Sequence, residues 1–266
     1  MRDSIEVHDQ MHHSVLLTKP PLRIVSLVPS LTELLADGFQ LFSAIVGVTD
    51  YCVHPSGIRE KVATIGGPKK IGVEQIKALN PDIVIASKEE NVRAQIEELR
   101  KEVPVFVTDV VDVPSALEAI SSLGKLVCAP QAASLLVDNI QKVFVSYKPF
   151  REDLSVAYLI WQDPLMTVSR GTFIHEMLSL AGFCNVFANS TQRYPQVELR
   201  DIAAQQPNLV LLASEPYSFT TEDKKSMQEQ LPHSKVVRVD GEMFSWYGNR
   251  MAKAPAYFKQ LFKFVV

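Results

Sequence analysis

Cysteine is scarce in this chain, whose 266 residues include only three. Cys52, Cys128 and Cys184 are widely spaced, odd in number and form no CxxC pair. That pattern argues against a disulfide framework and against a structural zinc knuckle. Long apolar runs are missing as well, because the longest extend over about eight to ten residues and a membrane-spanning helix needs roughly 20. We therefore expect no membrane span.

A secretory signal is not visible in the first residues, which read MRDSIEVHDQMHHSVLLTK. A secretory signal needs an uninterrupted apolar core behind a basic start. Here the charged side chains interrupt the segment before such a core forms; they are Arg2, Asp3, Glu6 and Asp9. If Met1 is the native start, the expected location is the cytoplasm.

An excess of one charge and the familiar catalytic motifs are missing too. The net charge is −3, from 27 basic and 30 acidic residues whose signs are interspersed. Without a basic stripe, nucleic acid is not an expected partner. No hydrolase elbow, zincin motif or dinucleotide fingerprint is visible. We therefore assign no catalytic residue and expect a protein that is not an enzyme.

What the chain does have is an ordinary globular composition, with 47% hydrophobic and 21% charged residues. Its length fits two lobes of roughly 100–130 residues, each able to bury its own core. An internal repeat supports this division, because residues 76–85 read IKALNPDIVI and residues 202–211 read IAAQQPNLVL. In both copies a helical pattern ends at proline, and an apolar run typical of a buried parallel strand follows.

Two copies of this unit predict two similar α/β lobes. Each lobe opens with its own strand, at residues 23–28 and at residues 155–161. Ser30 and Glu33 fit a capping box at the start of the first helix. Between the lobes, QAASLLVDNIQKVFVSYK predicts one helix of about 18 residues, or roughly 27 Å, which is long enough to act as a stiff bridge.

The predicted fold class is therefore α/β. It has two Rossmann-like lobes with short parallel sheets, one long bridging α-helix, and a ligand cleft between the lobes. The predicted domains are an N-terminal lobe at 1–127, a bridging helix at 128–150 and a C-terminal lobe at 151–266.

The order of several motifs resembles a known family. The first lobe contains RIVSLVPSLTELL, GVTDYCVHP and GVEQIKALNPDIVIAS, and the second contains GTFIHEMLSLAGFCNVF, RYPQVELRDIAAQQPNLVLLAS and FSWYGNR. This set, spread over residues 21–262, resembles the class III periplasmic binding proteins, the helical-backbone metal receptors. It is most similar to their cobalamin-binding branch. The resemblance implies a mostly periplasmic or lipid-anchored family that holds cobalamin, haem or a ferric siderophore between two lobes.

The resemblance and the loops after the strands together predict the ligand-binding residues. Aromatic and polar side chains at the carboxyl ends of parallel strands suit a broad, partly apolar ligand such as a corrin or a chelate. The candidates are Tyr51, His54, Ser87, Lys88, Glu89, Trp161, Tyr194, Trp246, Tyr247 and Arg250. Core packing remains an alternative for Trp161, and a solvated helix start remains one for Lys88 and Glu89.

The chain departs from the family pattern in two places. The resemblance implies docking on a transporter through one acidic residue on each lobe. Glu74 matches the first position, whereas Arg200 occupies the second and Glu198 lies two residues away. In addition, Ser87 stands where the cobalamin-binding relative has a tryptophan, so the identity of the ligand does not carry over.

Cys52 and His54 form the most chemically suggestive cluster, CVHP. A thiolate and an imidazole on one short loop suit zinc, copper, or the metal of a haem or corrin. The alternative is that Cys52 is a buried apolar residue and that His54 caps a turn. If the two residues bind a metal, a cytoplasmic metal- or corrinoid-dependent protein, an enzyme included, is the competing function.

The function predicted from the sequence is a solute-binding protein for a cobalamin-like or metal-chelate ligand. The expected partners are that small-molecule chelate and the permease of an ABC-type uptake system, and the protein is expected to be a monomer. No cofactor is assigned beyond the ligand itself, which would be cobalamin, haem or a ferric chelate.

Overall fold

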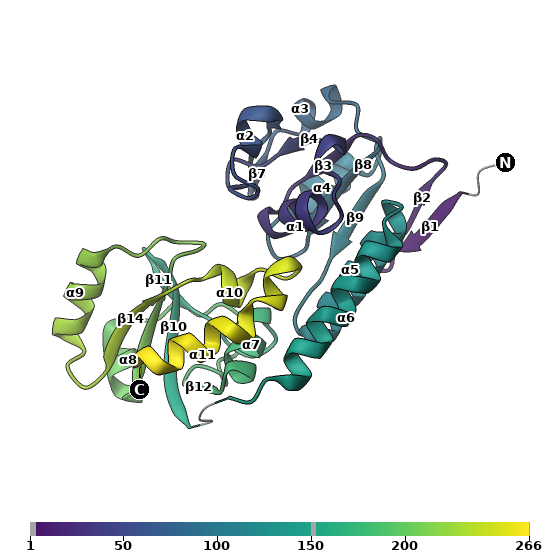
Figure 1. Cartoon of the computed structure of the whole chain (residues 1–266). Helices are drawn as coiled ribbons and strands as arrows, with labels where there is room; N and C mark the ends of the chain where they lie inside the picture. The colour runs from purple at the N-terminus through teal and green to yellow at the C-terminus, as the bar shows by residue number, and fades with distance from the viewer. Residues whose placement is uncertain (1–3, 150–152, 266) are drawn as a thin grey trace. The chain divides into compact units, whose positions relative to one another are not determined.

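The computed structural model describes residues 4–149 and 153–265 (Figure 1). Contacts within the chain divide it into two compact units. The first unit comprises Met1–Val110, Pro114–Gln141 and Tyr247–Asn249, and the second comprises Val111–Val113, Lys142–Trp246 and Arg250–Val266. Three residues from the C-terminal part of the chain therefore complete the N-terminal unit.

The first unit is built on a parallel sheet whose strand order is β5-β4-β3-β8-β9. The strands are β3 (Ile24–Ser26), β4 (Ile45–Val48), β5 (Ala63–Thr64), β8 (Ile83–Ser87) and β9 (Val105–Thr108). Every residue of β3, β8 and β9 is buried. Continuous apolar runs are typical of a parallel sheet covered on both faces, so this part of the sequence prediction is confirmed.

Helices lie between these strands in the sequence or follow the last of them. They are α1 (Pro29–Glu33), the π-helix η1 (Leu34–Gly38), the 3-10 helix η2 (Phe42–Ala44), α2 (Ile58–Lys61), α3 (Val73–Ala78), α4 (Arg93–Leu99) and α5 (Val113–Leu126). The predicted capping box of Ser30 and Glu33 is wrong. Val28 is the N-cap, Pro29 begins the helix, and Ser30 lies inside the first turn, because proline has its φ preset for a helix and lacks the N–H that would go unpaired there.

Two β-hairpins, which the sequence reasoning did not identify, flank this sheet. They are β1 (Ile5–His8) with β2 (Ser14–Leu17), and β6 (Gly66–Gly67) with β7 (Lys70–Ile71). The first hairpin is anchored by the buried carboxylate of Asp9. This carboxylate accepts hydrogen bonds from the backbone N–H groups of Met11 and His13 at 2.9 and 2.8 Å, and it pairs with Arg100 at 2.6 Å.

The second unit repeats the plan of the first. Its strands are β10 (Leu154–Gln162), β11 (Leu165–Thr167), β12 (Phe183–Asn185), β13 (Leu209–Ala213) and β14 (Lys235–Val239). β12, β10, β13 and β14 are parallel, whereas β11 folds back antiparallel on β10. A register irregularity between Leu159 and Trp161 accompanies this return.

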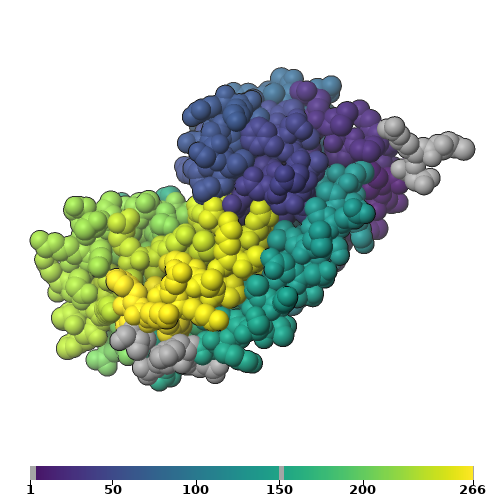
Figure 2. All heavy atoms as spheres, viewed as in Figure 1, coloured from purple at the N-terminus to yellow at the C-terminus, as the bar shows by residue number. Residues whose placement is uncertain are grey.

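Helices pack around the second sheet. They are α7 (Phe173–Ala181), α8 (Leu199–Gln205), α9 (Thr221–Gln230), α10 (Glu242–Ser245), the 3-10 helix η3 (Asn249–Ala252) and α11 (Ala254–Val265). One core cluster gathers Leu159 and Leu212 of the sheet with Phe219 and Met227. The C-terminal α11 buries Phe262, whose ring stacks on that of Phe183 in β12 with the ring centroids 4.7 Å apart. The outer side of α11 forms part of the surface of this unit (Figure 2).

The chain passes from the first unit to the second within α6 (Pro130–Ser146), a helix of 17 residues. Residues up to Gln141 belong to the first unit and those from Lys142 to the second. The predicted α/β class with short parallel sheets and one long connecting helix is confirmed. The predicted domain limits stay a prediction, and the limits at 150 and 151 lie outside the described residues.

Candidate functional site

Most of the residues predicted for the first lobe follow strands that end at one edge of its sheet. β4 ends at Val48, three residues before Tyr51, and β8 ends at Ser87 itself. Because β3, β4, β8 and β9 are parallel, their carboxyl ends share this edge. The loops that carry Tyr51, His54 and Ser87–Glu89 therefore start from the same side of the first unit, where α/β sheets bind their ligands.

Tyr51 offers an exposed aromatic surface, with 62% of the residue accessible. Its ring lies over Gly67 in the β6–β7 hairpin, where an added Cβ would come within 3.2 Å of Tyr51 Cε2. A glycine at this position therefore lets the ring lie against the backbone of the hairpin. His54 is half-buried and precedes Pro55 through a cis peptide bond.

Asn91 organises the loop after β8, a structural role that the sequence reasoning did not assign to it. Its Oδ1 accepts a hydrogen bond from the backbone N–H of Ser87 at 2.8 Å, and its Nδ2 donates to the carbonyl of Pro68 at 3.1 Å. The Lys69 ammonium donates to the backbone carbonyl of Glu89 at 2.7 Å. Asn91 thus ties the end of β8 to the β6–β7 hairpin that supports Tyr51. An asparagine a few residues beyond a buried strand was the available signal.

The Lys88 ammonium forms an ion pair with Asp109 at 2.6 Å, across the ends of β8 and β9. Both side chains are partly exposed, so the pair is accessible to solvent. A ligand that bound Lys88 would compete with Asp109 for the ammonium group. The ligand-binding role of Lys88 and Glu89 stays a prediction.

Cys52, in the loop after β4, is fully buried. Its Sγ lies 3.2 Å from Thr32 Oγ1 and 3.3 Å from Thr49 Oγ1. Burial raises the pKa of the Cys52 thiol, which disfavours the thiolate that a metal requires. Within residues 4–149 and 153–265, no group of three or more His, Cys, Asp or Glu side chains is arranged to hold a metal ion. A metal pair of Cys52 and His54 stays a prediction.

Tyr247 is buried in the first unit, with 7% of the residue accessible. Its hydroxyl lies 2.8 Å from Thr108 Oγ1 and is also hydrogen-bonded to Ser87. Burial raises the pKa of this hydroxyl well above its usual value. The hydroxyl therefore stays protonated and joins the ends of β8 and β9.

Trp246 and Arg250 lie in a polar cluster of the second unit. The Arg250 guanidinium lies 5.1 Å from the Trp246 ring centroid and pairs with Glu242 at 2.8 Å. The Ser245 hydroxyl donates to Glu215 at 2.7 Å, and the Trp246 side chain is also hydrogen-bonded to Glu215. Trp246 and Arg250 are both buried. Their role toward a ligand stays a prediction.

The other two aromatic candidates differ in their surroundings within the second unit. Trp161 is 41% accessible, packs edge-on against Tyr217 at 5.6 Å, and donates its indole N–H to the carbonyl of Asp163 at 3.0 Å. Tyr194 lies beside the guanidinium of Arg193, whose central carbon is 5.8 Å from the ring centroid. Trp161 is thus an accessible aromatic, and Tyr194 is paired with a cation.

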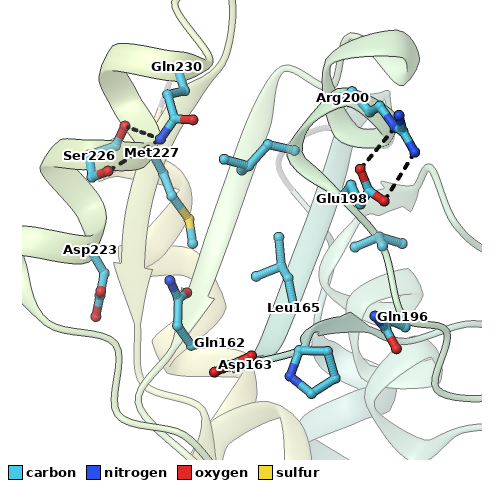
Figure 3. Close-up of a pocket in the computed structure, with 13 residues that line it drawn as sticks. Gln162, Asp163, Leu165, Gln196, Glu198, Arg200, Asp223, Ser226, Met227 and Gln230 are labelled. Carbon is cyan, nitrogen blue, oxygen red and sulfur yellow. Dashed lines mark hydrogen bonds and ion pairs between the residues drawn. The ribbon is translucent and has the colours of Figure 1, made fainter.

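The second unit also has a pocket of about 520 Å³, and none of the predicted ligand-binding residues is among those that line it (Figure 3). The turn after β10, the start of α8 and the inner side of α9 form its walls. Leu165 and Met227 give it an apolar floor, and the exposed pair of Glu198 and Arg200, 2.9 Å apart, lies at its rim. The charge of Arg200 is therefore neutralised by Glu198, the acidic residue that lies two positions away from the docking position in the sequence.

Glu74, the predicted docking residue of the first lobe, lies in the first turn of α3 with a side chain that is 82% accessible. It pairs with Lys77 at 2.9 Å. An exposed carboxylate is available for a partner, but docking itself stays a prediction. None of the helices in the described parts of the chain is both long and apolar enough to cross a bilayer.

Comparison with known proteins agrees with this architecture. Residues 24–238 match the family described as periplasmic binding proteins. A protein named vitamin B12-binding protein from Pectobacterium carotovorum is 25% identical over 243 residues, which cover 88% of this chain and 86% of the relative. One of the same name from Salmonella typhi is 27% identical over 195 residues, covering 72% of each chain.

Solved structures show the same fold. The periplasmic vitamin B12 binding protein of Vibrio cholerae superposes with a TM-score of 0.75 at 20% identity, covering 92% of this chain and 98% of the other. A periplasmic heme-binding protein from Roseiflexus gives a TM-score of 0.77 at 19% identity, covering 91% and 98%. At these identities the likeness concerns the fold, which two proteins named for different ligands share.

Proposed function

Because the chain belongs to the periplasmic binding protein family, we propose that it is a solute-binding protein for a cobalamin-like or metal-chelate ligand. The observation that carries this proposal is the family match over residues 24–238, together with relatives of similar length that are named for vitamin B12. These relatives are binding proteins and not enzymes. In the same proposal, the chain is the binding component of an ABC-type uptake system.

The loop edge of the first unit supports a broad, flat ligand. Tyr51 exposes an aromatic face, and the hairpin under it is held to the end of β8 through Asn91. Stacking of such a ring on a conjugated macrocycle or chelate strengthens ligand binding. The Tyr51 side chain loses little conformational entropy on binding because it already lies against the hairpin. Haem, cobalamin and ferric siderophores are all broad metal chelates, so the proposal includes all three.

The same family relation supports the proposed transporter partner. Glu74 offers an accessible carboxylate on the first unit, and the pair of Glu198 and Arg200 offers both charges on the second. We expect Glu74 to contribute to docking on a permease, and the second contact to differ from that of relatives with an acidic residue alone. The competing reading, a metal-dependent protein that uses Cys52, gains no support from a thiol that is fully buried.

A thermal-shift screen tests the ligand class. The purified protein is heated with cobalamins, haem, ferric siderophores and divalent metal salts, and binding is checked by absorbance. A ligand present at about 100 times its Kd adds roughly 2.7 kcal/mol to stability, which for a chain of this size raises Tm by roughly 5–10 °C. We expect such a shift with one of the coloured chelates.

A pair of variants makes the screen specific. Tyr51→Ala removes an exposed aromatic side chain from the candidate site, and Phe264→Ala removes one from α11 that is 65% accessible. The first variant should reduce the ligand-induced shift, while the second should leave it unchanged. A shift with free metal ions alone, and with no chelate, would refute the proposed ligand class.

A further inference from the structure

The outer side of α11 in the second unit carries positive charge and no negative charge. Its exposed residues are Ala256, Lys259, Gln260, Lys263 and Phe264. At 3.6 residues per turn these positions all fall on one side of the helix. Lys253, which directly precedes α11, is exposed as well and continues the same side. The lysines of this helix are therefore gathered on one surface.

The opposite side of α11 belongs to the core of the second unit. Ala254, Phe258 and Leu261 are buried there, and the ring of Phe258 lies 5.0 Å from that of Phe244 in α10, measured between centroids. An amphipathic helix that buries one side against its own domain presents the other side to solvent. The lysine side of α11 is accordingly part of the molecular surface (Figure 2).

Lys235, at the start of β14, extends this surface beyond the helix. Its ammonium group donates to the backbone carbonyls of Phe264 and Val265 at 2.9 and 3.2 Å. The same group lies 5.5 Å from the ring centroid of Phe264, which is 65% accessible. A cation and an accessible aromatic ring are thus adjacent. We call the set the basic face of α11; it comprises Lys235, Lys253, Lys259, Lys263 and Phe264.

Carboxylates do not offset this charge along the segment. Residues 243–265 contain Arg250 and three lysines but no aspartate or glutamate. Two carboxylates precede the segment: Glu242 pairs with Arg250 at 2.8 Å, and Asp240 accepts the backbone N–H of Glu242 at 3.1 Å. Among the residues that the structure describes, no ion pair involves the lysines at 253, 259 or 263.

The stability of the helix explains only part of this pattern. A cation near the C-terminal end of a helix is stabilising, because the helix dipole is negative there. Lys263, in the last turn of α11, fits that explanation. Lys253 does not, since it lies at the opposite end, where the dipole is positive and a cation is unfavourable. A positive charge along the whole length of α11 therefore calls for a reason outside the helix.

We propose that the basic face of α11 docks the second unit on an anionic lipid surface. The lysine ammonium groups lie against the phosphate headgroups, and the Phe264 ring reaches the boundary between headgroups and acyl chains, where aromatic rings are enriched. A bilayer offers anionic groups and an apolar layer together, so Phe264 favours a lipid over an acidic protein as the partner. The inference goes beyond the proposed function, because it involves neither the solute nor the residues predicted to bind it.

Vesicles of two compositions are the probes for this inference. One kind contains phosphatidylcholine alone, and the other contains phosphatidylcholine and phosphatidylglycerol in equal parts. The full chain is mixed with each kind at low ionic strength, and the vesicles are sedimented. We expect the protein to sediment with the anionic vesicles and to stay in the supernatant with the neutral ones. The bound fraction should fall at high ionic strength, because salt screens exposed charges.

Two double variants assign the binding to α11. Each lysine near an anionic surface contributes roughly fivefold to the partition constant, so Lys259→Gln with Lys263→Gln should lower it by roughly twentyfold. Lys224→Gln with Lys225→Gln changes the net charge by the same amount on α9 of the same unit, and it should bind as the wild type does. Circular dichroism and Tm show whether each variant folds.

Substitutions at Ala256, an exposed position on the same side of α11, test the inference in both directions. Ala256→Lys should raise the partition constant by roughly fivefold, and Ala256→Glu should lower it by a similar factor. A gain in binding does not arise from loss of folding. Phe264→Ala should weaken binding at both low and high ionic strength, because the contribution of the ring is hydrophobic and is not screened by salt.

Three outcomes would overturn the inference. Wild-type protein that stays in the supernatant with anionic vesicles does not bind an anionic lipid surface, and an acidic protein is then the better candidate for the basic face. Equal binding to neutral vesicles would show that the lysines do not direct it. An equal loss in the α9 and α11 double variants would show that net charge matters and the basic face does not. The proposed solute-binding function would stand in each case, because it is measured without vesicles.

Discussion

Glu215 follows β13 in the second unit and is partly buried. Burial raises the pKa of its carboxyl group, and the charges of Glu242 and Asp240 raise it too, whereas hydrogen bonds from Ser245 and Trp246 lower it. The net shift is upward. A carboxyl group whose folded pKa exceeds its unfolded value stabilises the protein below the unfolded pKa. That contribution is lost as the pH rises through the folded pKa.

Glu215→Gln should therefore gain stability relative to the wild type as the pH rises. Glutamine keeps an acceptor for the Ser245 hydroxyl, but it carries no charge to bury at high pH. The measurement is Tm of both proteins between pH 4 and pH 8, with the exposed Asp163→Asn as the control. A difference between variant and wild type that does not change with pH would contradict the raised pKa.

Single residues also show where sequence reasoning reaches its limit. Strand ends could be located from apolar runs, so Tyr51 was placed after the carboxyl end of one strand and Ser87 at the end of another, as the structure has them. The solvent exposure of a side chain could not be predicted from apolar runs. Trp246, Tyr247 and Arg250 are buried, at 5%, 7% and 9% accessibility. Trp246 and Tyr247 have partners that are distant in the sequence, Glu215 and Thr108. Those partners depend on tertiary packing, which a local pattern does not encode.

Close packing of helices α5 and α6 depends on Gly124. An added Cβ at this position would collide with the Cβ of Ala133 and lie 3.3 Å from the carbonyl of Ala129. We expect Gly124→Ala to cost about 1–3 kcal/mol of unfolding free energy, because overpacking outweighs the helix propensity gained. Urea unfolding of the variant measures this cost.

The double variant Gly124→Ala, Ala133→Gly is the control for this steric explanation. It removes the methyl group that the new side chain would meet, so it should recover much of the lost stability. If the double variant is no more stable than the sum of the two single variants predicts, the two helices do not meet as closely as described.

Helices and strands with a clear hydrophobic pattern were predicted from the sequence, whereas elements that depend on turns were missed. The internal repeat predicted α8 and β13, and their counterparts α3 and β8, with bounds that agree within a few residues. In each copy a proline marks the end of the helix and an apolar run marks the strand. The β1–β2 hairpin was missed because its stability comes from the buried Asp9 and its pairing with Arg100.

At the scale of the whole molecule, the chain connects its two units more than once. It leaves the first unit through α6, and residues Tyr247–Asn249 return to the first unit before the chain ends in the second. In this return, Asn249 Nδ2 donates to the Glu33 carbonyl at 3.2 Å. Gly248 has a φ of +110°, which an L side chain rarely adopts, so a glycine suits this narrow turn.

Tyr247 joins this returning segment to the sheet of the first unit. Thr108 Oγ1 donates to the Ala86 carbonyl at 3.2 Å, so the Tyr247 hydroxyl, 2.8 Å away, is the donor to Thr108. Tyr247→Phe removes this buried hydrogen bond and leaves Thr108 without it. We expect a loss of about 1–2 kcal/mol of stability.

Hydrogen exchange can locate that loss within the molecule. In Tyr247→Phe, exchange should rise for amides of β8 and β9 and stay unchanged for those of β13 and β14, because the lost bond belongs to the first unit alone. Tyr217→Phe, a tyrosine of the second unit, serves as the comparison variant. Equal acceleration in both sheets would mean that the two units unfold as one body. Acceleration confined to β8 and β9 would establish that a segment encoded near the end of the chain stabilises the unit encoded at its beginning.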